Sequence, residues 1–221
     1  MNIKTIKAIT RFLKPLSIKR NYPPKEGQRV ILMYHGVSKL PKLNCVTQSL
    51  FKEQISWLKE KYTIVPLSVL VENLKSSFPQ KNQSNFLSIT FDDGYVNFAE
   101  LALPILQELG CHATVFVPAG KAGSYNDWDE EISGFCKMEI MSYETIRQLP
   151  IESVEIGSHG ISHIALNRVS FREIEREIVG SRLEIEQNIS RPVQFFAFPF
   201  GVYPFKHRYR LYDDKTKLFL G

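Results

Sequence analysis

The sequence predicts an α/β fold, an incomplete or distorted (β/α) barrel built from parallel strands, and three observations support this prediction. Strand-like and helix-like segments alternate from about residue 29 onward. The strand-like segments are almost continuously apolar, which is typical of parallel strands covered on both faces. The residues able to carry chemistry directly follow these strands, and parallel sheets place their sites at the carboxyl ends of the strands. We therefore prefer the barrel to an open, doubly wound sheet, and we count six strands.

The first half of the domain is expected to hold three strands and three helices. Its strands are short apolar runs bounded by turn residues, and its helices carry apolar residues at helical spacing. Ser68 is the expected cap of the second helix, Pro104 is expected to kink the third, and Gly110 is expected to end it. In chain order the elements are a strand at 29–34, a helix at 47–61, a strand at 62–65, a helix at 67–74, a polar loop at 76–85, a strand at 86–91 and a helix at 96–109.

The second half continues the alternation. Ser170 and Glu173 form the Ser-x-x-Glu pattern of a capping box, which predicts that a helix begins there. The segment 120–138 is rich in Gly, Ser, Asn and Asp without a clear period, and we expect a long surface loop over the functional site. In chain order the elements are a strand at 112–117, this loop, a helix at 142–149, a strand at 154–157, a helix from 170 to about 189 and a strand at 194–198.

Length and composition fit one domain with a segment at either end. The 221 residues are 43% hydrophobic and 23% charged, which is ordinary for a globular protein with a sizeable core. We expect a basic extension at 1–28, a main domain at 29–201 and a short tail at 202–221 in which no element is predicted. The three cysteines are an odd number without a short spacing pattern, so reduced thiols are expected instead of a disulfide framework.

The positive charge is concentrated at the start of the chain. The net charge is +5, and residues 1–30 hold eight Lys and Arg residues against Glu26 alone. Apolar residues in 1–14 fall at helical spacing, so a helix on an anionic membrane surface, packing against the domain and a solvated extension all stay open. No segment has the apolar run of a spanning helix or a secretory signal, and no nucleic-acid-binding motif accompanies the basic residues. We expect a cytoplasmic protein with candidate peripheral membrane contact through residues 1–20 and no nucleic-acid partner.

The most informative motif is a pair of adjacent carboxylates, Asp92 and Asp93, at the end of the apolar strand at 86–91. Gly94 allows a sharp turn directly after them. One carboxylate could bind a divalent cation while its neighbour accepts a proton as a general base. The alternative is ordinary turn chemistry, because Asp-Asp-Gly is common in turns.

Two histidines four residues apart, His159 and His163, follow the strand at 154–157. Two imidazoles and a carboxylate are a common set of metal ligands, so together with the aspartate pair they predict a metal-assisted hydrolase site. His35 ends the first strand and is the best-placed acid for protonating a leaving group, provided that the strand ends meet. The alternatives are exposed loop histidines for the pair and a structural histidine for His35.

Three segments resemble the motifs of a known family, the polysaccharide deacetylases of the NodB-homology group, carbohydrate esterase family 4. Thr90-Phe-Asp-Asp-Gly94 resembles the first motif, Ser158-His-Gly-Ile-Ser-His163 the second and Phe198-Pro-Phe-Gly201 the third. Their order and spacing fit as well, and the resemblance covers about residues 29–201. Leu32-Met-Tyr-His35-Gly-Val37 is similar to the start of the permuted poly-N-acetylglucosamine deacetylases, in which an N-terminal strand ends in a Tyr-His pair.

The resemblance implies both a fold and a reaction. The fold would be a distorted (β/α) barrel of about seven strands. A divalent metal, most often zinc, would be held by Asp93, His159 and His163. Asp92 would be the base that activates the attacking water, and His35 would be the acid. The reaction would release acetate and a free amine from an N-acetylated sugar of a glycan. The implied substrate contacts come from Tyr95, Pro199, Phe200 and Gly201.

Three positions depart from the family pattern. Gly160 stands where Ser or Thr is usual, which removes a hydrogen bond that supports the ligands. Ala197 replaces an arginine that orients the catalytic aspartate in many members. The closing Leu-x-His motif is not found after Gly201, so the barrel is expected to be shortened at its carboxyl end, with His35 in place of the missing histidine.

These departures leave two alternatives beside an N-deacetylase, which is the leading hypothesis. The same site could remove O-acetyl groups from a glycan as an esterase. A non-catalytic glycan-binding or assembly protein could retain the groove without the activity.

Overall fold

The structure, a computed structural model, describes residues 27–75, 84–131, 134–207 and 219–220. Its strands are β1 (Arg29–Tyr34), β2 (Gly36–Ser38), β3 (Cys45–Thr47), β4 (Thr63–Ile64), β5 (Phe86–Phe91), β6 (Ala113–Val117), β7 (Val154–Ser158), β8 (Phe195–Phe196) and β9 (Phe219–Leu220). Its α-helices are α1 (Gln48–Lys59), α2 (Leu67–Lys75), α3 (Leu103–Glu108), α4 (Tyr143–Gln148), α5 (Phe171–Glu175) and α6 (Ser181–Ile189). A π-helical turn at Phe98–Ala102 leads into α3, and a second one at Arg176–Gly180 joins α5 to α6.

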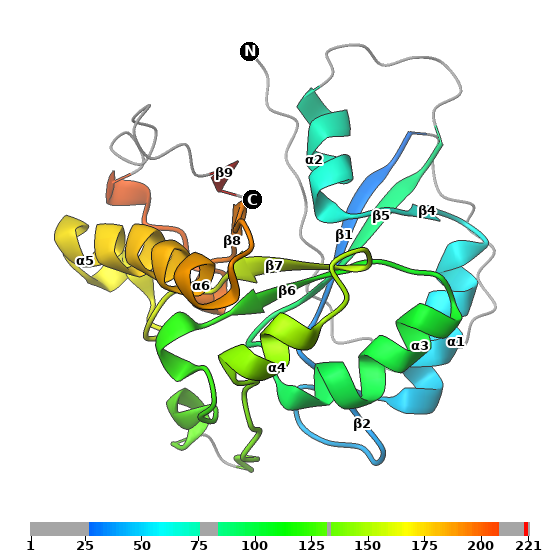
Figure 1. Cartoon of the computed structure of the whole chain (residues 1–221), viewed down its shortest axis with the longest axis horizontal. Coiled ribbons are helices and arrows are strands. Elements are labelled where there is room, and N and C mark those ends of the chain that lie inside the picture. Colours follow the sequence, from blue (N-terminus) through cyan, green and yellow to red (C-terminus); the bar gives the residue numbers. More distant parts are fainter. Residues whose placement is uncertain (1–26, 76–83, 132–133, 208–218, 221) are drawn as a thin grey trace.

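The main sheet is parallel throughout its described pairs and curls through the molecule (Figure 1). Its strands follow the order β1-β5-β6-β7-β8-β9, and β4 also pairs with β5. β4 lies beside the first part of β5, at Phe86 and Leu87, whereas β6 lies beside its end, at Thr90 and Phe91. The predicted fold class, an incomplete (β/α) barrel of parallel strands, is confirmed.

Helices cover the outside of this sheet. In Figure 1, α1, α3 and α4 lie together on one side of it, α6 lies against β7, and α2 lies beside β1 and β5. The main core fills the space between the sheet and these helices. Its central aromatic residue is Phe91, whose ring contacts Phe98, Tyr34 and Phe51 at centroid distances of 4.9, 5.4 and 5.8 Å. Because Phe91 is fully buried, it anchors the end of β5, the strand that leads into the aspartate pair.

Each of the six predicted strands is present, and three further ones were not predicted. β2 and β3 form a separate parallel pair, and β9 adds a seventh strand to the main sheet by pairing with β8. The helix was expected to kink at Pro104; the structure has a π-helical turn at Phe98–Ala102 directly before α3, with Pro104 in the first turn of α3. Gly110 has a φ of +61°, as expected for a residue that ends a helix in the left-handed conformation.

One of the two predicted helix caps, at Ser170, is present, and the other, at Ser68, is not. The capping box of Ser170 and Glu173 is confirmed, since each side chain accepts a hydrogen bond from the other residue's backbone N–H. Ser68 does not cap α2. Instead, the Glu155 carboxylate of β7 accepts a hydrogen bond from the Leu67 N–H at 2.9 Å, and the Ser68 hydroxyl donates to the same carboxylate. A carboxylate is the stronger partner there, because its charge interacts favourably with the helix dipole.

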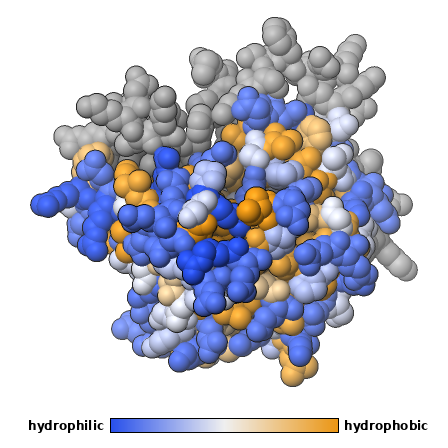
Figure 2. All heavy atoms as spheres, viewed as in Figure 1, coloured by the Kyte–Doolittle hydropathy of each residue, from blue (hydrophilic) through white to orange (hydrophobic). Residues whose placement is uncertain are grey.

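The face of the molecule drawn in Figure 2 carries hydrophobic side chains in separate groups among hydrophilic ones. Scattered apolar residues of this kind are normal for a globular protein. No helix in the described part of the chain is long and apolar enough to cross a membrane. The predictions for residues 1–20, for most of the 76–85 loop and for most of the 202–221 tail concern segments outside the described residues.

Candidate metal centre

Parallel pairing brings the predicted site residues to one edge of the sheet. Tyr34 pairs with Phe91, and the Asp92 N–H donates to the Tyr34 carbonyl at 2.9 Å, so His35 and Asp92 follow neighbouring strand ends. Farther along the sheet, the His159 N–H donates to the Val117 carbonyl at 2.9 Å. The carboxyl ends of β1, β5 and β7 therefore deliver His35, the aspartate pair and His159 to the same region, as the sequence predicted.

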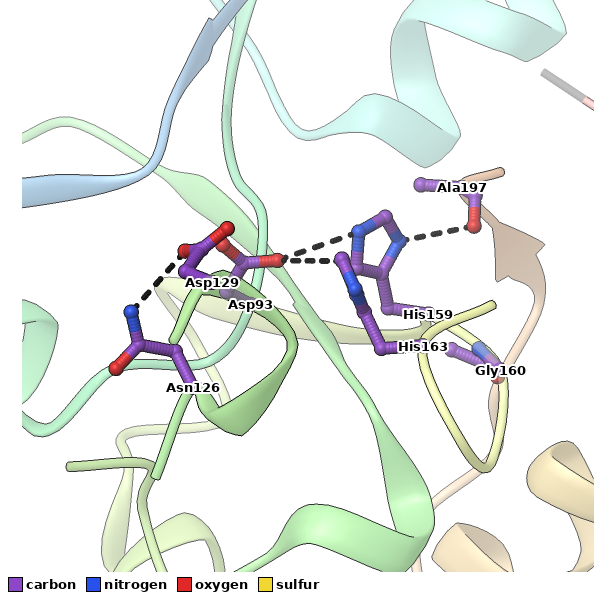
Figure 3. Close-up of polar contacts among 8 residues, drawn as sticks. Asp93, Asn126, Asp129, His159, Gly160, His163 and Ala197 are labelled. Atoms are coloured by element: carbon purple, nitrogen blue, oxygen red, sulfur yellow. Dashed lines mark hydrogen bonds and ion pairs between the residues drawn. The ribbon is translucent and has the colours of Figure 1, made fainter. Parts of the chain in front are cut away.

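Asp93, His159 and His163 form one buried group (Figure 3). The Asp93 Oδ1 atom lies 3.4 Å from Nε2 of His159 and 3.1 Å from Nε2 of His163. One candidate ligand atom from each residue lies within 4.8 Å of the other two. The predicted convergence of these three side chains is present, and the group is of a size that could hold a metal ion.

The backbone at this group adopts conformations that residues with a side chain rarely take. Asp93 has a φ of +70° and His163 a φ of +53°. Gly94 follows Asp93 with a φ of +63°, and a Cβ atom there would lie 3.3 Å from Val117 Cγ2. Backbone strain of this kind concentrates at functional sites. The sharp turn predicted at Gly94 is therefore present, and it directs Asp93 toward the two histidines.

A hydrogen bond orients the His159 ring. Its Nδ1 atom lies 2.9 Å from the Ala197 carbonyl oxygen, which can only accept, so Nδ1 carries the proton. In a neutral ring Nε2 then presents its lone pair toward Asp93. Position 197 has no arginine side chain to orient the catalytic aspartate. The backbone carbonyl of Ala197 instead accepts a hydrogen bond from a candidate metal ligand, His159.

Aromatic contacts orient the His163 ring instead. Trp128 stacks on it with a centroid distance of 3.8 Å and an interplanar angle of 23°, and Phe200 contacts it edge to face at 4.8 Å. The Nδ1 atom of His163 is buried without a hydrogen-bond partner among the described residues. One ligand is thus fixed by a polar contact and the other by packing.

The protonation of the group follows from burial and from the hydrogen bonds within it. Burial opposes ionisation of Asp93, but the imidazoles of His159 and His163, when protonated, can donate to this carboxylate, and their effect outweighs burial and holds the pKa of the carboxyl far below its usual range. Burial also lowers the pKa of His163, which favours the neutral ring that a metal ligand requires. Burial also acts to lower the pKa of His159, but the two neighbouring aspartates outweigh burial and raise this pKa above its ordinary value.

Asp92 lies next to this group, and its environment differs from that of Asp93. Burial raises the pKa of Asp92, although charged His159 and His35 imidazoles act in the opposite direction. His35 is half-buried at the end of β1 and close enough for its charge to act on Asp92. A carboxylate with a raised pKa is better suited to accept a proton near neutral pH.

The donor atoms fit a divalent cation. With neutral rings, Asp93 Oδ1 is buried without a hydrogen-bond partner among the residues that the structure describes, and the Nε2 atom of His159 faces it. Three electron-pair donors that face one another in a buried group repel unless a proton or a cation lies between them. One carboxylate and two imidazoles suit zinc and similar first-row divalent metals.

The predicted substrate contacts are only partly accessible. Tyr95 is 1% exposed and packs with Met138 and Ile140, so the prediction that it contacts substrate is wrong. The turn at Gly94 places its ring beneath the centre, where its hydroxyl lies close to Asp93. Phe200 is 57% exposed beside His163, whereas Pro199 is buried. Gly201, which follows, is exposed.

Three residues at the centre were not predicted. Trp128 and Asp129 belong to the 120–138 segment, which was expected to lie over the site. The negative charge of Asp129 acts to raise the pKa of His163. Buried Asn126 donates a hydrogen bond to the Asp129 carboxylate at 3.1 Å. The third residue is Glu177, which binds the backbone between the two histidines. A tryptophan in a polar loop was the one sequence signal that could have drawn attention to this segment.

A comparison with protein families identifies one match. The family model described as polysaccharide deacetylase matches residues 80–215, which is more than half of the chain. The match includes Asp92, Asp93, His159 and His163, and it begins after β1, the strand that carries His35.

Two curated relatives have similar sequences. The chain is 25% identical over 181 residues to YxkH of Bacillus subtilis strain 168, whose name places it provisionally among the polysaccharide deacetylases; the match covers 81% of this chain and 59% of that protein. It is 24% identical over 204 residues to the poly-beta-1,6-N-acetyl-D-glucosamine N-deacetylase of Staphylococcus aureus strain N315, covering 80% of this chain and 66% of that protein. The chain thus spans less than two thirds of the length of either relative.

Two solved structures have a similar fold. IcaB from Ammonifex degensii superimposes with a TM-score of 0.70 at 18% identity, covering 84% of this chain and 80% of that one. The Streptococcus pyogenes deacetylase PplD superimposes with a TM-score of 0.65 at 20% identity, covering 85% of this chain and 81% of that one. The likeness agrees with the curled parallel sheet described above.

Proposed function

The chain belongs to the polysaccharide deacetylase family, and we propose that it is a zinc-dependent N-deacetylase acting on an N-acetylhexosamine unit of a glycan. The observation that carries this proposal is the buried group of Asp93, His159 and His163 with Asp92 beside it. The name of the Staphylococcus aureus relative supports the substrate class, since that protein is an N-deacetylase of poly-N-acetylglucosamine.

In this proposal each residue of the centre has one task. Asp93, His159 and His163 would hold the metal, which when bound supplies Lewis-acid chemistry by polarising the oxygen atoms that reach it. Asp92 takes a proton from the attacking water. His35 gives a proton to the amine nitrogen as the C–N bond breaks, and acetate and a free amine leave. The raised pKa of Asp92 supports its assignment as the base.

Two aromatic residues beside the centre suit a sugar substrate. Trp128 is half-buried on one side of His163, and exposed Phe200 lies at another side of the same ring. Aromatic faces bind apolar surfaces such as the C–H face of a pyranose while leaving its hydroxyl groups in water. We therefore assign Phe200 to the substrate contacts, as the resemblance implied, and add Trp128 to them.

The substitution Asp92→Asn tests the proposal. It removes the base and preserves the shape of the side chain, so acetate release from an N-acetylglucosamine oligosaccharide should fall by about 100-fold or more. Bound zinc, measured by metal analysis after gel filtration, should stay at the wild-type level because Asp92 is not a ligand. Normal turnover in this variant would contradict the base assignment. On a peracetylated oligosaccharide, release of acetate that leaves free hydroxyl groups instead of free amines would identify an O-acetyl esterase.

A further inference from the structure

Glu177 is a buried carboxylate that the proposed reaction does not use. It is only 3% exposed and lies in the π-helical turn at Arg176–Gly180, between α5 and α6. π-Helical turns occur frequently at functional sites. A buried glutamate is rare unless its oxygens are paired, so the partners of this carboxylate indicate what it does.

Its partners are the backbone amides between the two candidate metal ligands. Glu177 Oε2 accepts hydrogen bonds from the Ile161 N–H at 2.7 Å and from the Ser162 N–H at 3.0 Å. These two amides lie in the three-residue stretch that separates His159 from His163. One buried oxygen thus accepts from both amides, so this carboxylate fixes the path of the loop.

Gly160 completes this arrangement. It has a φ of +84°, and a Cβ atom built on it would lie 2.9 Å from Glu177 Oε2. A side chain at position 160 would therefore displace the carboxylate from the two amides. The absence of a side chain at Gly160 thus leaves room for the Glu177 carboxylate.

A second contact joins the same helical segment to the same loop. Ser181 lies one turn after Glu177, and its hydroxyl is 2.6 Å from the hydroxyl of Ser158, the residue before His159. The Ser181 hydroxyl donates to the Ile178 carbonyl at 3.0 Å, and the Gly160 N–H donates to the Ser158 hydroxyl at 3.3 Å. The helical segment therefore binds the loop through Ser158 on one side of His159 and through Ile161 and Ser162 on the other.

We propose that Glu177 is a positioning residue for the metal centre, and that its carboxylate holds His159 and His163 in the arrangement that binds metal. The proposal rests on the proposed function only in that it requires a metal at this centre. The proposed role of Glu177 is geometric: its acceptor oxygen holds the amides of Ile161 and Ser162 in place.

Zinc affinity tests the proposal, measured on the full chain by competition with a chromophoric chelator. Removing a group that orients metal ligands typically weakens metal binding by 10- to 100-fold, so Glu177→Ala should raise the zinc dissociation constant by about that factor. Glu177→Gln keeps an acceptor oxygen of the same reach and should restore wild-type affinity.

Glu155→Ala is the matched control. Glu155 is also a carboxylate that accepts hydrogen bonds from two backbone amides, those of Leu67 and Ser68, but these amides belong to the start of α2 and not to the loop between His159 and His163. Both alanine variants should lower the melting temperature of the zinc-free protein. Only Glu177→Ala should weaken zinc binding, and this separates positioning from a general loss of stability.

Three results would overturn the proposal. One is wild-type zinc affinity in Glu177→Ala together with a lowered melting temperature. Another is a Glu177→Gln variant as weak as Glu177→Ala, because geometry alone would then not explain the effect. If Glu177→Ala does not fold, Glu177→Asp replaces it, and unchanged zinc affinity in that shorter variant overturns the proposal. A wild-type chain that binds no zinc would contradict the proposed function first and this inference with it.

Discussion

The two halves of the candidate centre are held in different ways. The aspartate half follows β5, whose last residue, Phe91, is buried among three aromatic rings of the main core. The histidine half lies on a loop after β7 that is held by polar contacts from Glu177 and Ser181 and by the Ala197 carbonyl. Packing of the main core therefore fixes the aspartate half, whereas local contacts fix the histidine half, namely a few hydrogen bonds and the aromatic rings beside His163. We expect the histidine half to be the more sensitive to single substitutions outside the ligands.

The largest effect is expected from removing the ligand of the aspartate half. Structural zinc sites bind with about 10–16 kcal/mol shared among four ligands, so Asp93→Asn should weaken zinc binding by about 100-fold or more. Asp92→Asn, one residue earlier, is the matched control and should keep zinc. Competition with the same chelator measures the zinc affinity of both variants. Equal affinity in Asp93→Asn and Asp92→Asn would contradict the assignment of Asp93, and not Asp92, as the metal ligand.

The pH dependence of zinc binding separates the halves further. The pKa of His159 is raised above its ordinary value of 6.5. As the solution is acidified, protons should therefore begin to compete with zinc for this ring while the pH is still above 6.5. Below the pKa of His159, affinity should fall by about tenfold per pH unit for one competing proton. The pKa of Asp93 is lowered, so this carboxylate should stay ionised over the same range. Zinc titrations between about pH 5 and 8 would measure this, and a flat profile would contradict the assignment of His159 as a ligand.

The smallest effect is expected from the aromatic support of His163. A stacked aromatic pair contributes about 0.5–1.5 kcal/mol beyond its buried area, so Trp128→Ala should weaken zinc binding by roughly two- to tenfold. Trp128→Phe should recover part of the loss, because a smaller ring can still stack on the imidazole. The same titration measures both variants. Loss of zinc binding as complete as in Asp93→Asn would mean that packing, and not the ligand set, dominates this half.

The parts predicted correctly from the sequence depend on local patterns. The six strands follow from apolar runs, and the capping box follows from Ser170 and Glu173. The motif residues Asp92, Asp93, His159 and His163 converge because parallel strands bring their carboxyl ends to one edge. β2 and β3 were not predicted because strands of three residues are too short for a clear period.

The errors concern contacts between segments that are distant in the sequence or turns that redirect a side chain. Ser68 looked like a cap, but Glu155, 87 residues later, occupies that role. Tyr95, which directly follows the first motif, was assigned to the substrate contacts, whereas the turn at Gly94 directs its ring into the core. Glu177 lies beside the apolar positions Ile174 and Ile178 in the sequence, and only the fold places the histidine loop against it.

A crystal structure of the zinc-soaked protein, with anomalous diffraction data collected at the zinc edge, tests the central claim most directly. The account predicts one strong anomalous peak at about 2.0–2.2 Å from a carboxylate oxygen of Asp93 and from Nε2 of both His159 and His163. A peak at other residues, or none within coordination distance of these three atoms at saturating zinc, would contradict it.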